Sequence, residues 1–84
     1  MRALTAGLLL LSLPCAAQQP DDNTRCTQGR VELSAQAAKF EGEPMIKRLI
    51  EADLKRASKE QAEGDADECL EALEHAAKLL KGEI

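Results

Sequence analysis

Aromatic side chains are almost absent from this 84-residue sequence, which has no Trp, no Tyr and one Phe, Phe40. Proteins that stack on sugars or nucleic-acid bases need a platform of aromatic rings. The chain also lacks a glycine-rich phosphate loop and any alternating run of β-branched residues that would mark a strand. We therefore expect no stacking site and no phosphate-binding loop, and helices as the secondary structure.

Histidine is equally scarce, since His75 is the only one. A nucleophilic enzyme needs a nucleophile, a base within reach of it and a group that orients the base. Ser34 and Ser58 supply hydroxyls, but the helical pattern places neither of them near His75. We therefore expect a protein that is not an enzyme, has no catalytic residues and uses no cofactor, with His75 on the solvated surface.

Metal-ligating residues do not occur in the spaced Cys and His sets of a structural zinc site. Carboxylates and the imidazole gather instead on adjoining turns of one helix, at Asp67, Glu71, Glu74 and His75. These four residues are candidates for a metal-binding patch. An acidic first turn that stabilises its own helix explains the same residues, so we expect no dedicated metal site.

Residues 1–17 have the order of a secretory signal peptide. Met1-Arg2 gives a positive start, an apolar run follows, and small residues at Cys15 and Ala17 suit cleavage after Ala17. The run is shorter than the roughly 20 residues that span a bilayer. We expect cleavage and a periplasmic or secreted protein; the alternative is an uncleaved segment that holds the chain at the membrane.

The charge balance of the mature chain is acidic. Cleavage removes Arg2 and leaves 10 basic and 15 acidic residues, a net charge of −5. Phosphate binding requires a basic stripe, so nucleic acid is not an expected partner, and an anionic membrane surface would repel the chain. We expect another protein, or a second copy of this chain, as the partner.

Apolar spacing predicts an all-α, up-down-up bundle of three helices over residues 25–84, after a flexible polar segment at residues 18–24. Asp22, Asn23 and Thr24 are each candidates to cap the first helix. Gly29 weakens that helix, because glycine is a poor helix former. The three expected buried stripes are Cys26, Leu33, Ala37 and Phe40; Ile46, Leu49, Ile50, Leu54 and Ala57; and Cys69, Leu70, Leu73, Ala76, Ala77 and Leu80.

Short turns separate these helices. Gly42 suits the left-handed position after a helix end, and Pro44 suits the first turn of the next helix. Gly64 ends the second helix. Asp65 then begins the third, with Glu68 three residues later in the order of a capping box.

Two cysteines, Cys26 and Cys69, remain after cleavage, and an even pair in an oxidising compartment predicts one disulfide. Cys26 lies near the start of the first helix and Cys69 near the start of the third. The second helix returns the chain to the end where it began, so both cysteines should meet there. A bridge that closes about 44 residues contributes on the order of 4 kcal/mol in the chain-entropy model.

The stretch AEGDADECLEALEHAAKLL, residues 62–80, resembles the Gly-Asp helix start of tetratricopeptide repeats. That family stacks helical pairs into a concave peptide-binding surface. The resemblance covers about a quarter of the chain and has no second copy 34 residues away, whereas stacks need about three units. It implies a shared helix-hairpin pattern, not membership.

The leading functional hypothesis is a small exported helical binding or interaction protein. Val31, Met45 and Leu79 lie off the main stripes, and we expect them to form the contact surface if they make one exposed patch. One alternative is an envelope-stress protein of the holdase kind, whose acidic third helix loses charge on acidification. Another is a metal-binding periplasmic protein that uses the patch on the third helix.

Overall fold

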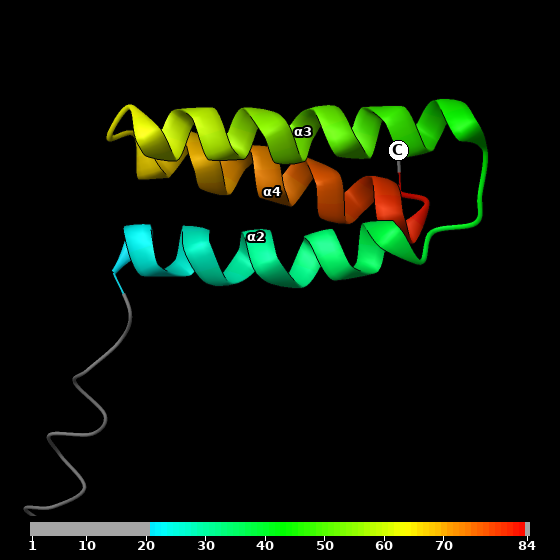
Figure 1. Cartoon of the computed structure of the whole chain (residues 1–84), viewed down its shortest axis with the longest axis horizontal. Coiled ribbons are helices and arrows are strands. Elements are labelled where there is room, and N and C mark those ends of the chain that lie inside the picture. Colours follow the sequence, from blue (N-terminus) through cyan, green and yellow to red (C-terminus); the bar gives the residue numbers. More distant parts are fainter. Residues whose placement is uncertain (1–20, 84) are drawn as a thin grey trace, which may run out of the picture.

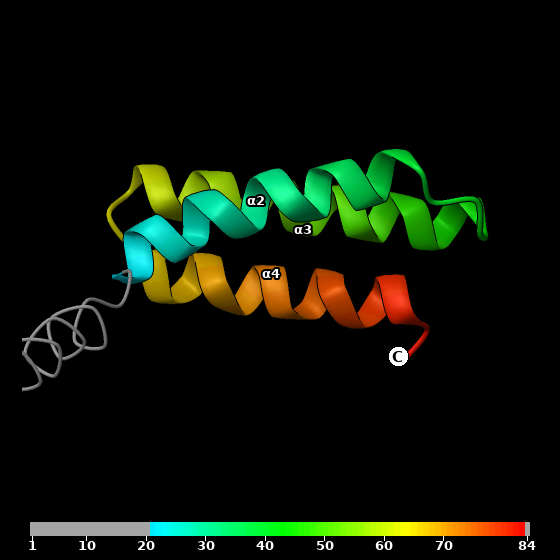
Figure 2. The same cartoon turned by 90° about the horizontal axis from the view of Figure 1, so that it is seen from below.

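The structure is a computed structural model that describes residues 21–83. It contains three helices there, α2 (Asp22–Ala38), α3 (Pro44–Ala62) and α4 (Ala66–Lys81). Figure 1 and Figure 2 show α2 and α4 running in the same direction and α3 in the opposite one. The predicted three-helix up-down-up bundle is confirmed. The predicted signal peptide, residues 1–17, lies outside the described residues.

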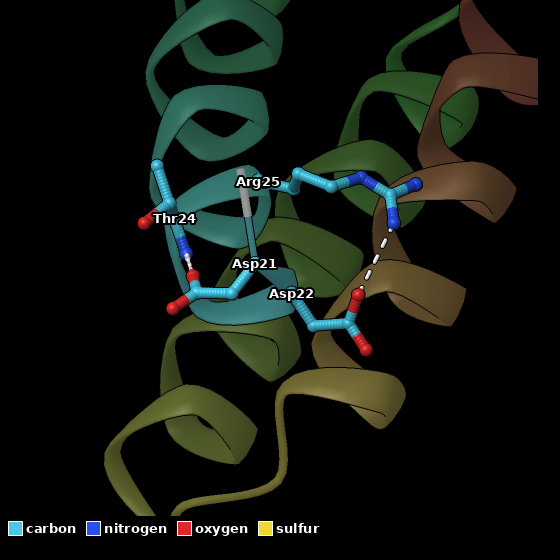
Figure 3. A network of polar contacts seen from close by, with 4 residues as sticks. All are labelled: Asp21, Asp22, Thr24 and Arg25. Carbon is cyan, nitrogen blue, oxygen red and sulfur yellow. Dashed lines mark hydrogen bonds and ion pairs between the residues drawn. The ribbon is translucent and has the colours of Figure 1, made fainter. Parts of the chain in front are cut away.

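Helix α2 begins earlier than the sequence predicts. Its N-cap is Asp21, whose carboxylate accepts a hydrogen bond from the backbone N–H of Thr24 at 2.8 Å (Figure 3). The expected caps at Asp22, Asn23 and Thr24 are wrong, because these residues form the first turn instead. The polar composition of the segment before residue 25 concealed a helix start, since capping residues are themselves polar.

The connection between α2 and α3 differs from the prediction at Gly42. Within residues 21–83, only Gly64 and Gly82 have positive φ angles, so Gly42 is not left-handed. A Cβ atom at Gly42 would overlap the ring of Phe40. Gly42 is therefore needed because it lets the only aromatic ring fold back over the chain, and Phe40 itself lies beyond the end of α2.

The junction between α3 and α4 follows the prediction closely. Gly64 takes a φ of 84° after α3, and Asp65 caps α4 by accepting a hydrogen bond from the N–H of Glu68 at 3.2 Å. The Glu68 side chain does not complete a capping box. It accepts a hydrogen bond from Arg56 of α3 at 3.1 Å instead, so it joins two helices.

The core is narrow and rich in small residues. Its largest fully buried side chains are Ile50, Cys26 and Cys69. Three positions differ from the expected stripes. Leu49 is 43% exposed, whereas Ala72 and Leu79, which lie outside the expected stripe, are only 0% and 4% exposed. Helix α4 packs against both other helices, so it buries a wider band than one stripe. The buried residues are Cys26, Leu33, Ala37, Ile50, Ala57, Cys69, Ala72, Leu73, Ala76 and Leu79.

A polar network joins α2 to α3 near the Asp21 end. Arg30 donates to Gln61 at 2.6 Å and to Ser58 at 3.0 Å. The Gln61 amide in turn donates to the side chains of Asn23, at 3.0 Å, and Thr27, at 2.7 Å. One glutamine therefore ties the first turns of α2 to the last turn of α3.

Candidate functional site

The two cysteines meet as predicted. Cys26 and Cys69 form a disulfide with Cα atoms 6.0 Å apart, across a sequence separation of 43 residues. Both residues have no solvent exposure. The bridge joins the N-terminal turns of the two parallel helices, so it fixes α2 beside α4 at one end of the bundle.

An open groove lies between α2 and α4 at this same end. Its α2 side consists of Asp22, Arg25 and Gly29. Its α4 side provides two apolar side chains, Leu70 and Leu73, and the carboxylates of Asp67, Glu71 and Glu74. We refer to these eight residues as the α2–α4 groove.

Gly29 and Leu73 make the floor of this groove. A Cβ atom at Gly29 would lie 2.8 Å from Cδ1 of Leu73, closer than side-chain carbons pack. The absence of a side chain therefore allows Leu73 to lie directly against the backbone of α2. Gly29 weakens α2 as an isolated helix, but it permits the close approach of the two helices that the disulfide joins.

The rim of the groove is acidic and its carboxylates crowd one another. Arg25 pairs with Asp22 at 3.1 Å within α2 (Figure 3). Across the groove, a hydrogen bond with Asp22 and the charge of that carboxylate raise the pKa of Asp67, and Asp65 and Glu68 add to the repulsion. At the N-cap of α2 the effect is opposite, because the hydrogen bonds from Thr24 lower the pKa of Asp21.

His75 lies on the other flank of α4 and faces α3. Its Nδ1 atom is 2.5 Å from Oδ2 of Asp53. The Asp53 side chain is 13% exposed and that of His75 is 48% exposed. His75 lies on the surface as expected, and an interhelical hydrogen bond holds its ring.

This arrangement separates the residues of the candidate metal patch. Asp67 lines the groove on the α2 side, whereas His75 contacts Asp53 of α3. Glu71 and Glu74 lie between them, because they line both this groove and an adjoining hollow that includes His75. Between residues 21 and 83, no three His, Cys, Asp or Glu side chains are placed to hold a metal ion. The metal-binding alternative therefore finds no set of three ligands placed together in the described part of the chain.

The two serines considered as nucleophiles do not contact His75. Ser58 accepts a hydrogen bond from Arg30 between α2 and α3, while His75 contacts α3 through Asp53 from α4. Ser34 borders a depression formed by α2 residues alone, beside Val31. The structure therefore pairs neither serine with the histidine in the described part of the chain.

The apolar patch expected from Val31, Met45 and Leu79 does not form, and that expectation is wrong. Leu79 belongs to the core, while Val31 and Met45 remain 69% and 60% exposed. Met45 lies in the first turn of α3 and Val31 in the middle of α2. The helical period alone placed Leu79 outside, because it could not show that α4 has a neighbour on two sides.

Compared with known proteins, the chain matches no family model, no curated protein and no solved structure. No helix within residues 21–83 is both long enough and apolar enough to cross a membrane. The buried disulfide is compatible with an oxidising compartment outside the cytoplasm. The residues and their geometry therefore carry the functional argument.

Sequence reasoning missed three features of this region: the groove itself, the role of Gly29 and the pairing of His75 with Asp53. The position of Asp53 indicated such a pairing, because this carboxylate interrupts the apolar stripe of α3 and a mostly buried carboxylate needs a partner. A glycine inside a predicted amphipathic helix was also a signal of close helix packing. Neither signal identifies the partner residue.

Proposed function

We infer that this chain is a small exported binding protein that engages another protein through its helical surface and catalyses no reaction. One observation supports this above all: an open groove with an apolar floor and an acidic rim lies between two helices that a buried disulfide joins. Covalently joined helices lose little conformational freedom on binding, which favours affinity.

Export is tested by expression of the full chain with its own N-terminus. We expect the product outside the cytoplasm to begin at Gln18, and non-reducing peptide mapping to give a peptide pair that contains Cys26 and Cys69. Cytoplasmic chains that retain Met1, with free thiols at Cys26 and Cys69, would contradict a periplasmic or secreted location.

Binding is tested by photo-cross-linking in cells that produce the chain. A cross-linking amino acid at Glu71, in the groove, should give an adduct with one protein, and the same amino acid at exposed Lys55 of α3 serves as the control. An adduct with a second copy would identify self-association. If neither position, nor exposed positions on α2, gave a protein adduct, the binding function would be wrong.

The envelope-stress alternative makes a different prediction, because a holdase of this kind must open in acid. The raised pKa of Asp67 means that acid relieves repulsion within the groove, so this pair of carboxylates does not drive opening. Circular dichroism and molecular mass between neutral pH and about pH 3 distinguish the two functions. A helical monomer that does not change would count against the holdase.

A further inference from the structure

The α2–α4 groove combines an apolar strip with an uncompensated negative charge. Along α4, Leu70, Leu73, Ala77 and Leu80 recur every three or four residues and so share one flank of the helix. Leu70 and Leu73 of this flank line the groove. Leu73 packs on Gly29 at the floor, and the other three are only partly covered by the chain itself. The strip therefore offers apolar surface beside the groove.

The charge of the groove is strongly one-sided. Four carboxylates face one guanidinium, Arg25, and this guanidinium already pairs with Asp22. Glu74 has a distant partner in Lys78 at 3.9 Å, whereas Asp67 and Glu71 take part in no ion pair within residues 21–83. Negative charge is thus left for a ligand to neutralise.

We propose that the α2–α4 groove binds a cationic, apolar segment of a partner protein, whose apolar side chain packs on Leu70 while its Lys or Arg side chains pair with Asp67, Glu71 and Glu74. This inference rests on the proposed binding function and names the class of partner. Complementary charge around an apolar centre is the usual layout of a helix or peptide in a groove.

Other occupants fit this surface less well. An anionic lipid surface or a nucleic acid would place negative charge against the rim. A second copy presents the same acidic groove, so two grooves would repel each other at low salt. The crowding that raises the pKa of Asp67 is relieved by a cation that approaches from outside, which is what a basic side chain of a partner supplies.

The test uses the oxidised chain from Gln18 onward and a short amphipathic peptide of lysine and leucine as the probe. The matched peptide with glutamate in place of lysine is the negative control. We expect the lysine peptide to bind, to perturb the amide resonances of Gly29, Leu70 and Leu73, and to weaken with rising salt. The glutamate peptide should not bind.

Two protein variants with the same change in net charge separate a site from general attraction. The groove variant is Asp67→Asn/Glu71→Gln/Glu74→Gln, and the control variant replaces three exposed acids elsewhere, Glu41→Gln/Glu51→Gln/Glu63→Gln. The groove variant should lose at least about tenfold in affinity, and the control variant no more than about twofold. Circular dichroism checks that both remain folded.

Each outcome bears on the proposal. Equal losses in both variants, or resonance changes spread over all three helices, would mean non-specific attraction and overturn it. A cross-linked partner found on another face, with no peptide bound in the groove, would overturn this inference and leave the binding function standing. No adduct at any exposed position and no peptide binding would remove both.

Discussion

The carboxylates of Asp22 and Asp67 belong to different helices and still come close enough to share a hydrogen bond. Two like charges at that distance repel each other, which favours the protonated form of one of them. The disulfide and the contact of Leu73 with Gly29 hold α2 and α4 together at this end. Packing by these other residues thus brings the two carboxylates together at the groove. Their repulsion is a consequence of that packing.

The first residue-scale prediction concerns Asp67. The pKa of Asp67 is raised above the usual 3.8, so the folded protein favours the protonated carboxyl group. This favourable form is present at low pH and is lost as the pH rises through the raised value. Asp67→Asn should therefore increase stability at neutral pH, and the gain should vanish in strong acid. Urea unfolding from about pH 2 to pH 7 measures it. Glu51→Gln, at an exposed position of α3, should give no such gain.

A second residue-scale prediction concerns Gly29. Gly29→Val forces side-chain atoms into the space of Leu73, whose Cδ1 lies 2.8 Å from the position of the new Cβ. Overpacking of this kind costs about 1–3 kcal/mol. The control Gln28→Val, at the adjacent exposed position, should cost less. Equal thermal unfolding of the two variants would contradict the close approach of α2 to α4.

At the scale of the helices, the N-terminal caps decide where α2 and α4 begin. Asp21 and Asp65 each accept a backbone hydrogen bond from the residue three positions ahead. Lys78 and Lys81 lie in the last turn of α4 and complement its dipole. Both helices therefore carry their start signals locally, whereas α3 begins with Pro44 and has no side-chain cap.

The cap of α2 gives a pH-dependent prediction. The pKa of Asp21 is lowered from the usual 3.8 by its hydrogen bonds from Thr24. The stabilisation is thus present above 3.8 and is lost as the pH falls through the lowered value. Asp21→Ala should be less stable than the natural chain at neutral pH, and this deficit should shrink in acid. Asp21→Asn, which retains an acceptor oxygen, should show a smaller deficit in the same thermal melts.

The contact between α2 and α3 depends on Gln61. Gln61→Ala removes the acceptor of Arg30 and the donor to Asn23 and Thr27. A half-buried network of this kind contributes about 1 kcal/mol. We expect that loss in urea unfolding, together with faster hydrogen exchange in the first turns of α2. The exposed control Gln36→Ala should leave exchange there unchanged, and equal exchange in both variants would contradict the role of Gln61.

At the scale of the whole molecule, the buried disulfide compensates for a limited core. Within residues 21–83, four of the ten buried core residues are alanines, Ala37, Ala57, Ala72 and Ala76. Alanine lets helices approach closely but buries little apolar area, and small domains commonly need a covalent staple. A bridge over 43 residues therefore contributes a large part of the net stability.

Removal of that bridge is the prediction for the whole molecule. Cys26→Ala/Cys69→Ala should lower the free energy of unfolding by about 4 kcal/mol, because the unfolded chain regains the freedom that the closed loop denies it. Urea unfolding under oxidising conditions measures this loss. The single change Met45→Ala, at a 60% exposed position, is the control and should cost little. A double variant as stable as the natural chain would disprove the stapling role.

The sequence alone was enough for the helical class, the turns at Gly64 and Asp65, and the pairing of Cys26 with Cys69. These features follow from local rules, since a cap and a left-handed glycine depend on neighbouring residues, and the length of the middle helix can be counted along the sequence. The groove, the burial of Leu79 and the pairing of His75 with Asp53 depended on tertiary structure. A helical period shows which residues share a face, but only the packing of three helices determines how many faces are covered and which charges meet across them.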